Sequence, residues 1–254
     1  MSDQQKQIDI NPLNEVQAMA EFVALQSSPV YRGKNLPKGN GMPVVVLPGL
    51  FANDLYLQTI HQWLKRLGYQ PIRSNILWNV GCPKRLVQTT VEHVQSKLKD
   101  NPEKIAIIGH SRGGMLGKAL AHYFSDRLHS LIVVGSPLGA MLALGKHGLE
   151  HFAGVSAENQ QFANPNLVQL GRSFTQLLDP NCNSPLCSCE YIDQLFEPLP
   201  PSVNVVSIYS ENDPIVPAPA SMMAGAHNIT VTGSHSGLMF NEEVYPYIAH
   251  ALAN

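Results

Sequence analysis

The stretch that decides the expected fold, residues 105–114, reads I-A-I-I-G-H-S-R-G-G. An apolar run ends there in a glycine-rich turn, and a helix-like run, M-L-G-K-A-L-A-H-Y-F, follows. The pattern G-x-S-x-G is typical of a serine held on a sharp strand-to-helix turn, although the pattern alone is weak evidence. The context strengthens it, because Gly109 and Gly113 allow neighbouring backbone to approach the turn closely. Ser111 is therefore a candidate nucleophile if the chain supplies partners for it.

Apolar runs of strand length alternate with helix-like segments on both sides of this turn. Strands without polar alternation are buried on both faces, and strands that alternate with helices favour a parallel sheet between two layers of helices. The fold class we expect is therefore α/β with a mostly parallel sheet. Strand-like runs occupy residues 42–50, 70–77, 104–109, 129–137, 202–210 and 228–234, and helix-like runs occupy residues 56–68, 85–99, 112–125 and 241–252.

Two segments depart from this alternation. Residues 1–42 contain an amphipathic helix at 11–26, which we expect to lie on the main body, and then a polar connector. Its apolar residues at helical spacing are Leu13, Val16, Met19, Phe22 and Val23. Residues 138–200 hold few strand-like runs, and we interpret them as an insertion that caps the C-terminal edge of the sheet. Residues 43–254 then form one domain that includes this cap, a size that suits a single core.

The chain offers a base and an acid for Ser111. A serine hydroxyl is a poor nucleophile at neutral pH and needs a base that a carboxylate orients. Asp213 follows the strand-like run ending in Y-S, and His235 follows the run N-I-T-V-T-G. Catalytic groups of open parallel sheets collect at the carboxyl ends of the strands, where all three residues are expected. The sequence thus predicts a triad of Ser111, His235 and Asp213, with Glu211 as the nearest rival acid.

Attack on a carbonyl also requires donors for the oxyanion that forms. The backbone N–H of Arg112, directly after the nucleophile, is the first candidate. The second is the backbone N–H of Leu50, in the loop L-P-G-L-F-A that follows the first strong strand. Gly49 leaves the backbone free to aim that N–H.

These residues together resemble the α/β-hydrolase family, and within it the bacterial lipase- and esterase-type serine hydrolases. The resemblance covers about residues 43–136 and 202–252. Pro48-Gly49-Leu50 stands where those enzymes often have His-Gly-x, a departure that keeps the Leu50 donor but removes a side chain that can brace the loop. The family implies hydrolysis of a carboxylic ester, thioester or related acyl bond, without a cofactor and without a metal. One fold hosts many reactions, so the substrate stays open.

Composition excludes some classes of partner. The net charge is −2 and no run of Lys and Arg follows a phosphate backbone, so nucleic acid is not an expected partner. The apolar stretches are shorter than the ~20 residues of a membrane span, and the first ten residues carry no apolar signal segment. We expect a soluble, cytoplasmic protein without stable membrane insertion, and its oligomeric state is open.

Histidines and cysteines outside the triad have structural interpretations first. His110 is expected to point inward with a structural role. The stretch H-G-L-E-H at 147–151 matches a zinc-protease pattern, but Gly145 and Gly148 weaken the helix that this geometry requires. The four cysteines are expected to be mainly free thiols, with a local disulfide or a metal as the alternatives. They are Cys82, Cys182, Cys187 and Cys189.

The expected function is hydrolysis of a small-molecule or lipid-like ester through an acyl-enzyme on Ser111. Phe51, Met141 and Leu238 are candidate walls of an apolar substrate pocket, although residues 138–144 suit a helix packed on the sheet equally well. Two alternatives remain: an acyltransferase with the same triad, and a binding protein that kept the fold without catalysis. A dehalogenase would need a carboxylate at position 111.

Overall fold

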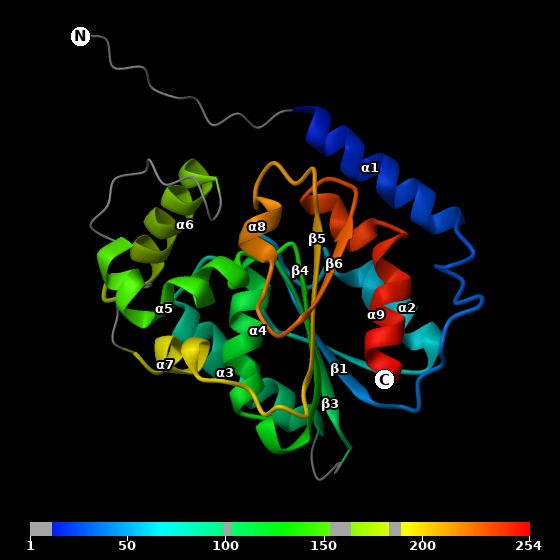
Figure 1. Cartoon of the computed structure of the whole chain (residues 1–254), viewed down its shortest axis with the longest axis horizontal. Coiled ribbons are helices and arrows are strands. Elements are labelled where there is room, and N and C mark those ends of the chain that lie inside the picture. Colours follow the sequence, from blue (N-terminus) through cyan, green and yellow to red (C-terminus); the bar gives the residue numbers. More distant parts are fainter. Residues whose placement is uncertain (1–11, 99–102, 153–163, 183–188) are drawn as a thin grey trace.

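A six-stranded sheet crosses the middle of the molecule, and every pair of neighbouring strands is parallel (Figure 1). The computed structural model describes residues 12–98, 103–152, 164–182 and 189–254. The strand order is β2-β1-β3-β4-β5-β6. The strands are β1 (Pro43–Leu47), β2 (Gln70–Arg73), β3 (Ile105–His110), β4 (Leu128–Val134), β5 (Asn204–Ser210) and β6 (His227–Val231). The predicted α/β class with a mostly parallel sheet is confirmed.

The central strands are apolar at consecutive positions because the sheet has a core on each face. Val44 and Val46 of β1 belong to one buried cluster, whereas Val45 and Leu47 belong to the other. Successive side chains of a strand point to opposite faces, so a strand covered on both sides has no polar position to spare.

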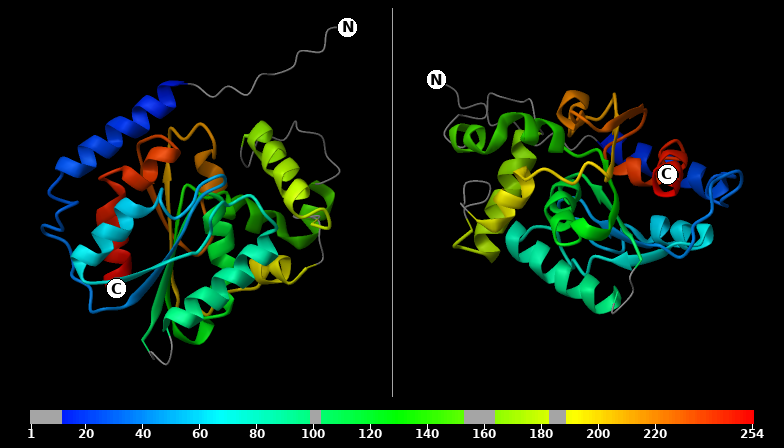
Figure 2. Two further views of the ribbon diagram at one scale, coloured as in Figure 1. Left: turned by 180° about the vertical axis from the view of Figure 1, so that it is seen from behind. Right: turned by 60° about the horizontal axis from the view of Figure 1, so that its bottom comes forward.

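Helices cover both faces of the sheet (Figures 1 and 2). On one face lie α2 (Gln58–Leu67) and α9 (Val244–Ala253), where Trp63 packs edge-on against Tyr245 at 4.7 Å between ring centroids. On the other lie α3 (Pro83–Leu98), α4 (Arg112–His122) and α7 (Glu190–Phe196). Three short helical turns lie in the connections between these elements: η1 (Ser125–Arg127), α8 (Ala218–Ser221) and η2 (Ser236–Phe240).

The helix α1 (Pro12–Ser27) lies on the body as expected, but only part of the apolar stripe that suggested it faces the body. Val16, Met19 and Val23 are 60–65% exposed. The packed side uses Phe22 from that stripe, which meets Phe240 edge-on at 5.5 Å, together with Leu25, which is fully buried. α1 carries apolar residues around more of its circumference than one face can bury, so spacing alone does not identify the packed side.

The segment 138–200 is helical where it is described. α5 (Leu138–Phe152) is broken at Gly145, whose φ of +68° is not helical, and α6 (Pro165–Leu178) follows. α7 packs against α4 and α3, so it belongs to the layer on one face of the sheet rather than to a cover over the strand ends. The cap therefore remains a proposal for α6. The side chains of the H-x-x-E-H stretch at 147–151 lie outside the described residues.

Four strands, β1, β2, β4 and β6, end earlier than the sequence suggests, and local contacts explain two of these ends. The strand expected over residues 129–137 ends at Val134, because Gly135 takes a φ of +55°. The strand expected over 70–77 ends at Arg73, because the Asp54 carboxylate accepts the N–H groups of Ser74 and Asn75 at 3.0 and 2.9 Å and turns the chain away.

Over the described ranges, none of the helices has the length and apolar character that crossing a bilayer requires.

Candidate active site

Ser111 stands on a strained turn between β3 and α4. Its φ is +52° and its ψ is −123°, a conformation that non-glycine residues rarely adopt and that costs about 1–3 kcal/mol. The surrounding bonds hold it there, since its N–H donates to the Val134 carbonyl at 2.9 Å and its carbonyl accepts the Gly114 N–H at 2.9 Å. A serine fixed in this way directs its hydroxyl out of the end of the sheet.

Glycines flank the turn because other backbone occupies the space that a side chain would need. A Cβ at Gly113 would lie 2.5 Å from the carbonyl oxygens of Leu47 and Pro48. A Cβ at Gly109 would collide with the backbone of Gly113 and Gly114. The G-x-S-x-G spacing therefore allows the start of α4 to pack directly against the end of β1.

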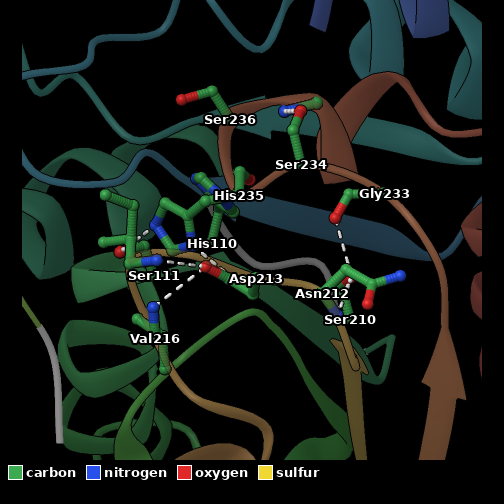
Figure 3. A network of polar contacts seen from close by, with 12 residues as sticks. His110, Ser111, Ser210, Asn212, Asp213, Val216, Gly233, Ser234, His235 and Ser236 are labelled. Carbon is green, nitrogen blue, oxygen red and sulfur yellow. Dashed lines mark hydrogen bonds and ion pairs between the residues drawn. The ribbon is translucent and has the colours of Figure 1, made fainter. Parts of the chain in front are cut away.

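Figure 3 shows Asp213, His235 and Ser111 joined in a line. The His235 Nε2 lies 2.9 Å from the Ser111 Oγ, and the His235 Nδ1 lies 2.7 Å from an oxygen of Asp213. The side chain of Asp213 is 1% exposed and that of His235 is 9% exposed. The three predicted residues thus meet at the carboxyl ends of β3, β5 and β6, whereas Glu211 is exposed. This geometry is the one that a nucleophile, a base and an orienting acid need in a covalent mechanism, and the three roles stay a prediction.

The acid is fixed by the loop that carries it. The second Asp213 oxygen accepts the N–H groups of Ile215 and Val216 at 2.8 and 2.9 Å. Ser210 joins this loop to the loop of the base, because its hydroxyl donates to the Gly233 carbonyl at 2.7 Å and accepts the Asn212 N–H at 3.1 Å (Figure 3). The carboxylate therefore keeps one oxygen for His235.

His110 is buried and contacts the backbone of His235, in agreement with the inward orientation expected for it. Its Nε2 lies 3.0 Å from the His235 carbonyl oxygen, which makes Nε2 the protonated nitrogen and the donor. Burial, with a smaller contribution from His235, lowers the pKa of His110 to about 3. His110 is therefore neutral at physiological pH and acts as a hydrogen-bond donor without a charge.

The two expected oxyanion donors belong to adjoining segments. Arg112 is the first residue of α4, where backbone N–H groups have no partner within the helix and the helix dipole favours negative charge. Leu50 follows Gly49, and a Cβ at Gly49 would lie 3.2 Å from the Ser111 Cβ. The loop after β1 therefore touches the nucleophile, and its donor role stays a prediction.

Asn79 and the Arg112 side chain brace that loop, and no sequence pattern indicates this role for either of them. The Asn79 amide donates to the Pro48 carbonyl at 2.7 Å, and the Asn79 carbonyl accepts the Phe51 N–H at 3.2 Å. The Arg112 guanidinium donates to the Asn79 side-chain and backbone oxygens at 2.8 and 2.9 Å and to the Gly81 carbonyl at 2.7 Å. Burial lowers the pKa of Arg112. This network replaces the bracing side chain that Pro48 does not supply.

The three expected pocket residues have different surroundings. Phe51, at a φ of +62°, joins an aromatic cluster with Phe174 and Trp78, with centroids 5.4 and 6.2 Å away. Met141 is partly buried against the core beneath α4. Leu238 is fully buried beside Gly135 in the core under α9, and its place in the wall of an apolar substrate pocket stays a prediction.

α6 bridges two loops of the site. Near its start, the Asn164 N–H donates to the Ile215 carbonyl at 2.9 Å, two residues after the acid. Further along, Gly171 lies against the Leu50 side chain and the Thr175 hydroxyl donates to the Val80 carbonyl at 2.6 Å. Phe174 contacts Trp78 edge-on at 5.5 Å. α6 therefore extends from the acid loop to the loop of the expected oxyanion donor.

The described part of the chain also contains potential metal ligands and thiols. No group of three or more His, Cys, Asp or Glu side chains within it has the geometry to hold a metal ion. Cys82 is a free thiol, and Cys187 lies outside the described residues.

Comparison with known proteins identifies the fold. A family model described as a PGAP1-like alpha/beta domain matches residues 83–176, which include Ser111. A carboxylesterase from the thaumarchaeon Nitrososphaera gargenis has 17% identity and a TM-score of 0.52, covering 85% of this chain and 92% of its own. A metagenomic carboxyl esterase has 14% identity and a TM-score of 0.51, covering 85% of this chain and 76% of its own. No curated protein matches the sequence. The fold is that of the α/β-hydrolase superfamily.

Proposed function

We propose that this protein is a serine hydrolase that cleaves carboxylic esters through an acyl-enzyme on Ser111. The observation that carries the proposal is the chain of contacts from Asp213 through His235 to Ser111, at 2.7 and 2.9 Å, on the strained turn at the end of β3. Two solved structures with the same fold are carboxylesterases, which favours the same class of substrate.

In the first half of the reaction, the Ser111 Oγ attacks the ester carbonyl while His235 Nε2 takes the hydroxyl proton. Asp213 holds the tautomer with the proton on Nδ1 and stabilises the imidazolium. The N–H groups of Leu50 and Arg112 donate hydrogen bonds to the negatively charged oxygen of the tetrahedral intermediate and stabilise it. As it collapses, the C–O bond of the leaving alcohol breaks and His235 returns the proton to the alkoxide.

In the second half, a water molecule takes the place of the alcohol. His235 removes its proton, the hydroxide attacks the acyl carbon, and the Ser111 Oγ leaves with the proton from His235. The aromatic cluster of Phe51, Trp78 and Phe174 offers apolar surface beside the expected oxyanion loop, which suits an ester with an apolar acyl or alcohol part. No nucleic acid, metal or cofactor enters this scheme, and cytoplasmic location remains a prediction.

The test compares wild type with Ser111→Ala on p-nitrophenyl esters from acetate to dodecanoate. We expect the variant to keep its thermal midpoint and to lose about 10⁴-fold or more in kcat/KM. Ser96→Ala, which removes an exposed hydroxyl on α3, is the matched control and should behave as wild type. Equal hydrolysis by folded wild type and folded Ser111→Ala would refute the serine mechanism. Transfer of the acyl group to added alcohols in place of water would point to the acyltransferase alternative.

A further inference from the structure

Glu21, on the helix that precedes the sheet, reaches the turn that carries the base. Its Oε1 accepts the backbone N–H of Ser234 at 2.9 Å, and its Oε2 accepts the Ser234 hydroxyl at 2.8 Å. Ser234 is 3% exposed and directly precedes His235. One carboxylate thus satisfies both donors of the residue next to the catalytic histidine, across 213 positions of sequence.

The turn is shaped to admit this carboxylate. Glycines stand on both sides of Ser234 at positions 233 and 237, and Gly233 has a φ of +126°. A Cβ at Gly233 would lie 2.8 Å from Glu21 Oε1, and a Cβ at Gly237 would overlap Glu21 Oε2. Both sides of the contact are therefore matched to each other, because the Glu21 carboxylate occupies space that a side chain at position 233 or 237 would fill.

Ser234 passes this restraint to the base. Its hydroxyl, which donates to Glu21, accepts the Gly237 N–H at 3.1 Å, and its carbonyl accepts the Leu238 N–H at 3.0 Å. These bonds form the start of η2, and His235 is the N-cap residue that links Ser234 to this turn. Two further contacts hold His235. Its backbone carbonyl accepts a hydrogen bond from His110, and its ring is hydrogen-bonded to Asp213.

We propose that Glu21 is a positioning residue for catalysis: through Ser234 it fixes the backbone that aims His235 at Ser111, and it makes α1 a functional part of the site. This inference rests on the proposed function for its effect on turnover. A displacement of about 1 Å in a catalytic group is enough to cost about 10²-fold in rate. Loss of the hydrogen bonds between Glu21 and Ser234 therefore acts on kcat rather than on substrate binding.

The experiment measures kcat and KM on p-nitrophenyl butanoate for Glu21→Ala, Glu21→Gln and Ser234→Ala, with Glu243→Ala as the matched control. Glu243 accepts the Thr232 N–H and hydroxyl in the same loop at 3.3 Å each, but it does not contact the residues around His235. We expect Glu21→Ala to lower kcat about 10- to 100-fold with KM within about twofold. Glu21→Gln keeps an acceptor for the Ser234 N–H and should recover most of the loss. The Glu21→Ala and Ser234→Ala effects should not add.

A second readout does not depend on turnover. The proton on His235 Nδ1, shared with Asp213, is followed by NMR in the folded full-length protein. We expect Glu21→Ala to shift or broaden this resonance and Glu243→Ala to leave it in place. Unchanged kcat and an unchanged resonance in Glu21→Ala would refute the positioning role of Glu21 while leaving the proposed function standing. A wild type without Ser111-dependent turnover would refute the proposed function, and the resonance would still decide whether Glu21 positions His235.

Discussion

The turns that carry the triad and the helix α6 differ in how firmly each is held. Ser111, Asp213 and His235 lie at strand ends, and each is fixed by buried bonds to neighbouring backbone. α6 is joined to the site by few polar bonds, through Asn164 and Thr175, and otherwise by contacts of Gly171 and Phe174. From this difference we expect the proposed chemistry to depend on the sheet edge, and the choice of ester to depend on α6 and the aromatic cluster that it contacts.

The largest effect on activity is expected when the carboxylate of Asp213 is replaced by an uncharged amide. Asp213→Asn keeps the size of the side chain but replaces an oxygen that accepts the His235 proton with a group that can donate, which favours the wrong tautomer. We expect kcat on a p-nitrophenyl ester to fall by about 10³- to 10⁴-fold with little change in KM. Glu211→Gln, two residues away and exposed, is the control. A loss of activity in the Glu211 variant instead would reassign the acid.

The next effect tests how closely the sheet edge is packed. Gly113→Ala places a methyl group 2.5 Å from two carbonyl oxygens of the loop after β1, so either α4 or that loop must move. We expect a loss of about 1–3 kcal/mol in the free energy of unfolding, measured by urea denaturation. Gly225→Ala is a matched variant, because nothing lies within 4 Å of that position, although its φ of +77° adds a smaller backbone cost. Equal losses in the two variants would contradict the packing argument.

Acid should destabilise the region around the base through His110. Burial lowers its pKa to about 3, so the unfolded chain, with an ordinary value near 6.5, binds a proton that the native state does not bind between these two pH values. Stability therefore falls as pH falls below 6.5, by about 2 kcal/mol at pH 5 for this one group. His61, with a pKa lowered by burial to about 4, adds to the slope in the same direction.

The measurement is urea unfolding at pH 7.5 and pH 5 for wild type and His110→Gln. Glutamine keeps an N–H donor for the His235 carbonyl but does not titrate, so the variant should lose less stability on acidification. A pH dependence equal to that of wild type would show that His110 does not carry the effect.

The smallest effect is expected on substrate choice, at the aromatic cluster that α6 contacts. Trp78 is 47% exposed and contacts Phe51 and Phe174, so Trp78→Ala removes apolar surface without touching the triad. We expect kcat/KM to fall about fivefold on long p-nitrophenyl esters, which corresponds to about 1 kcal/mol, and to stay unchanged on the acetate. Leu177→Ala, an exposed change on α6, should leave both rates unchanged. Equal losses on acetate and dodecanoate would place Trp78 outside the substrate path.

Sequence reasoning located the sheet and the three triad positions because both depend on local patterns. A buried parallel strand is apolar at every position, and its end is where catalytic groups collect, so Ser111, Asp213 and His235 could be placed from the strands alone. Contacts between distant polar residues leave no such pattern. Glu21 meets Ser234, and Asn79 meets Arg112, across long separations in sequence. The packed face of α1 was predicted only in part, because Glu21 and Leu25 lie on it beside Phe22, whereas other residues of the apolar stripe are exposed.

The most direct test of the central claim is covalent labelling of the folded, full-length protein with a fluorophosphonate, followed by intact-mass measurement and peptide mapping. We expect one adduct per chain, located on Ser111, with labelling strongly slowed in His235→Ala and abolished in Ser111→Ala. A folded wild-type protein that takes up no adduct, or that carries the adduct on another residue, would contradict it.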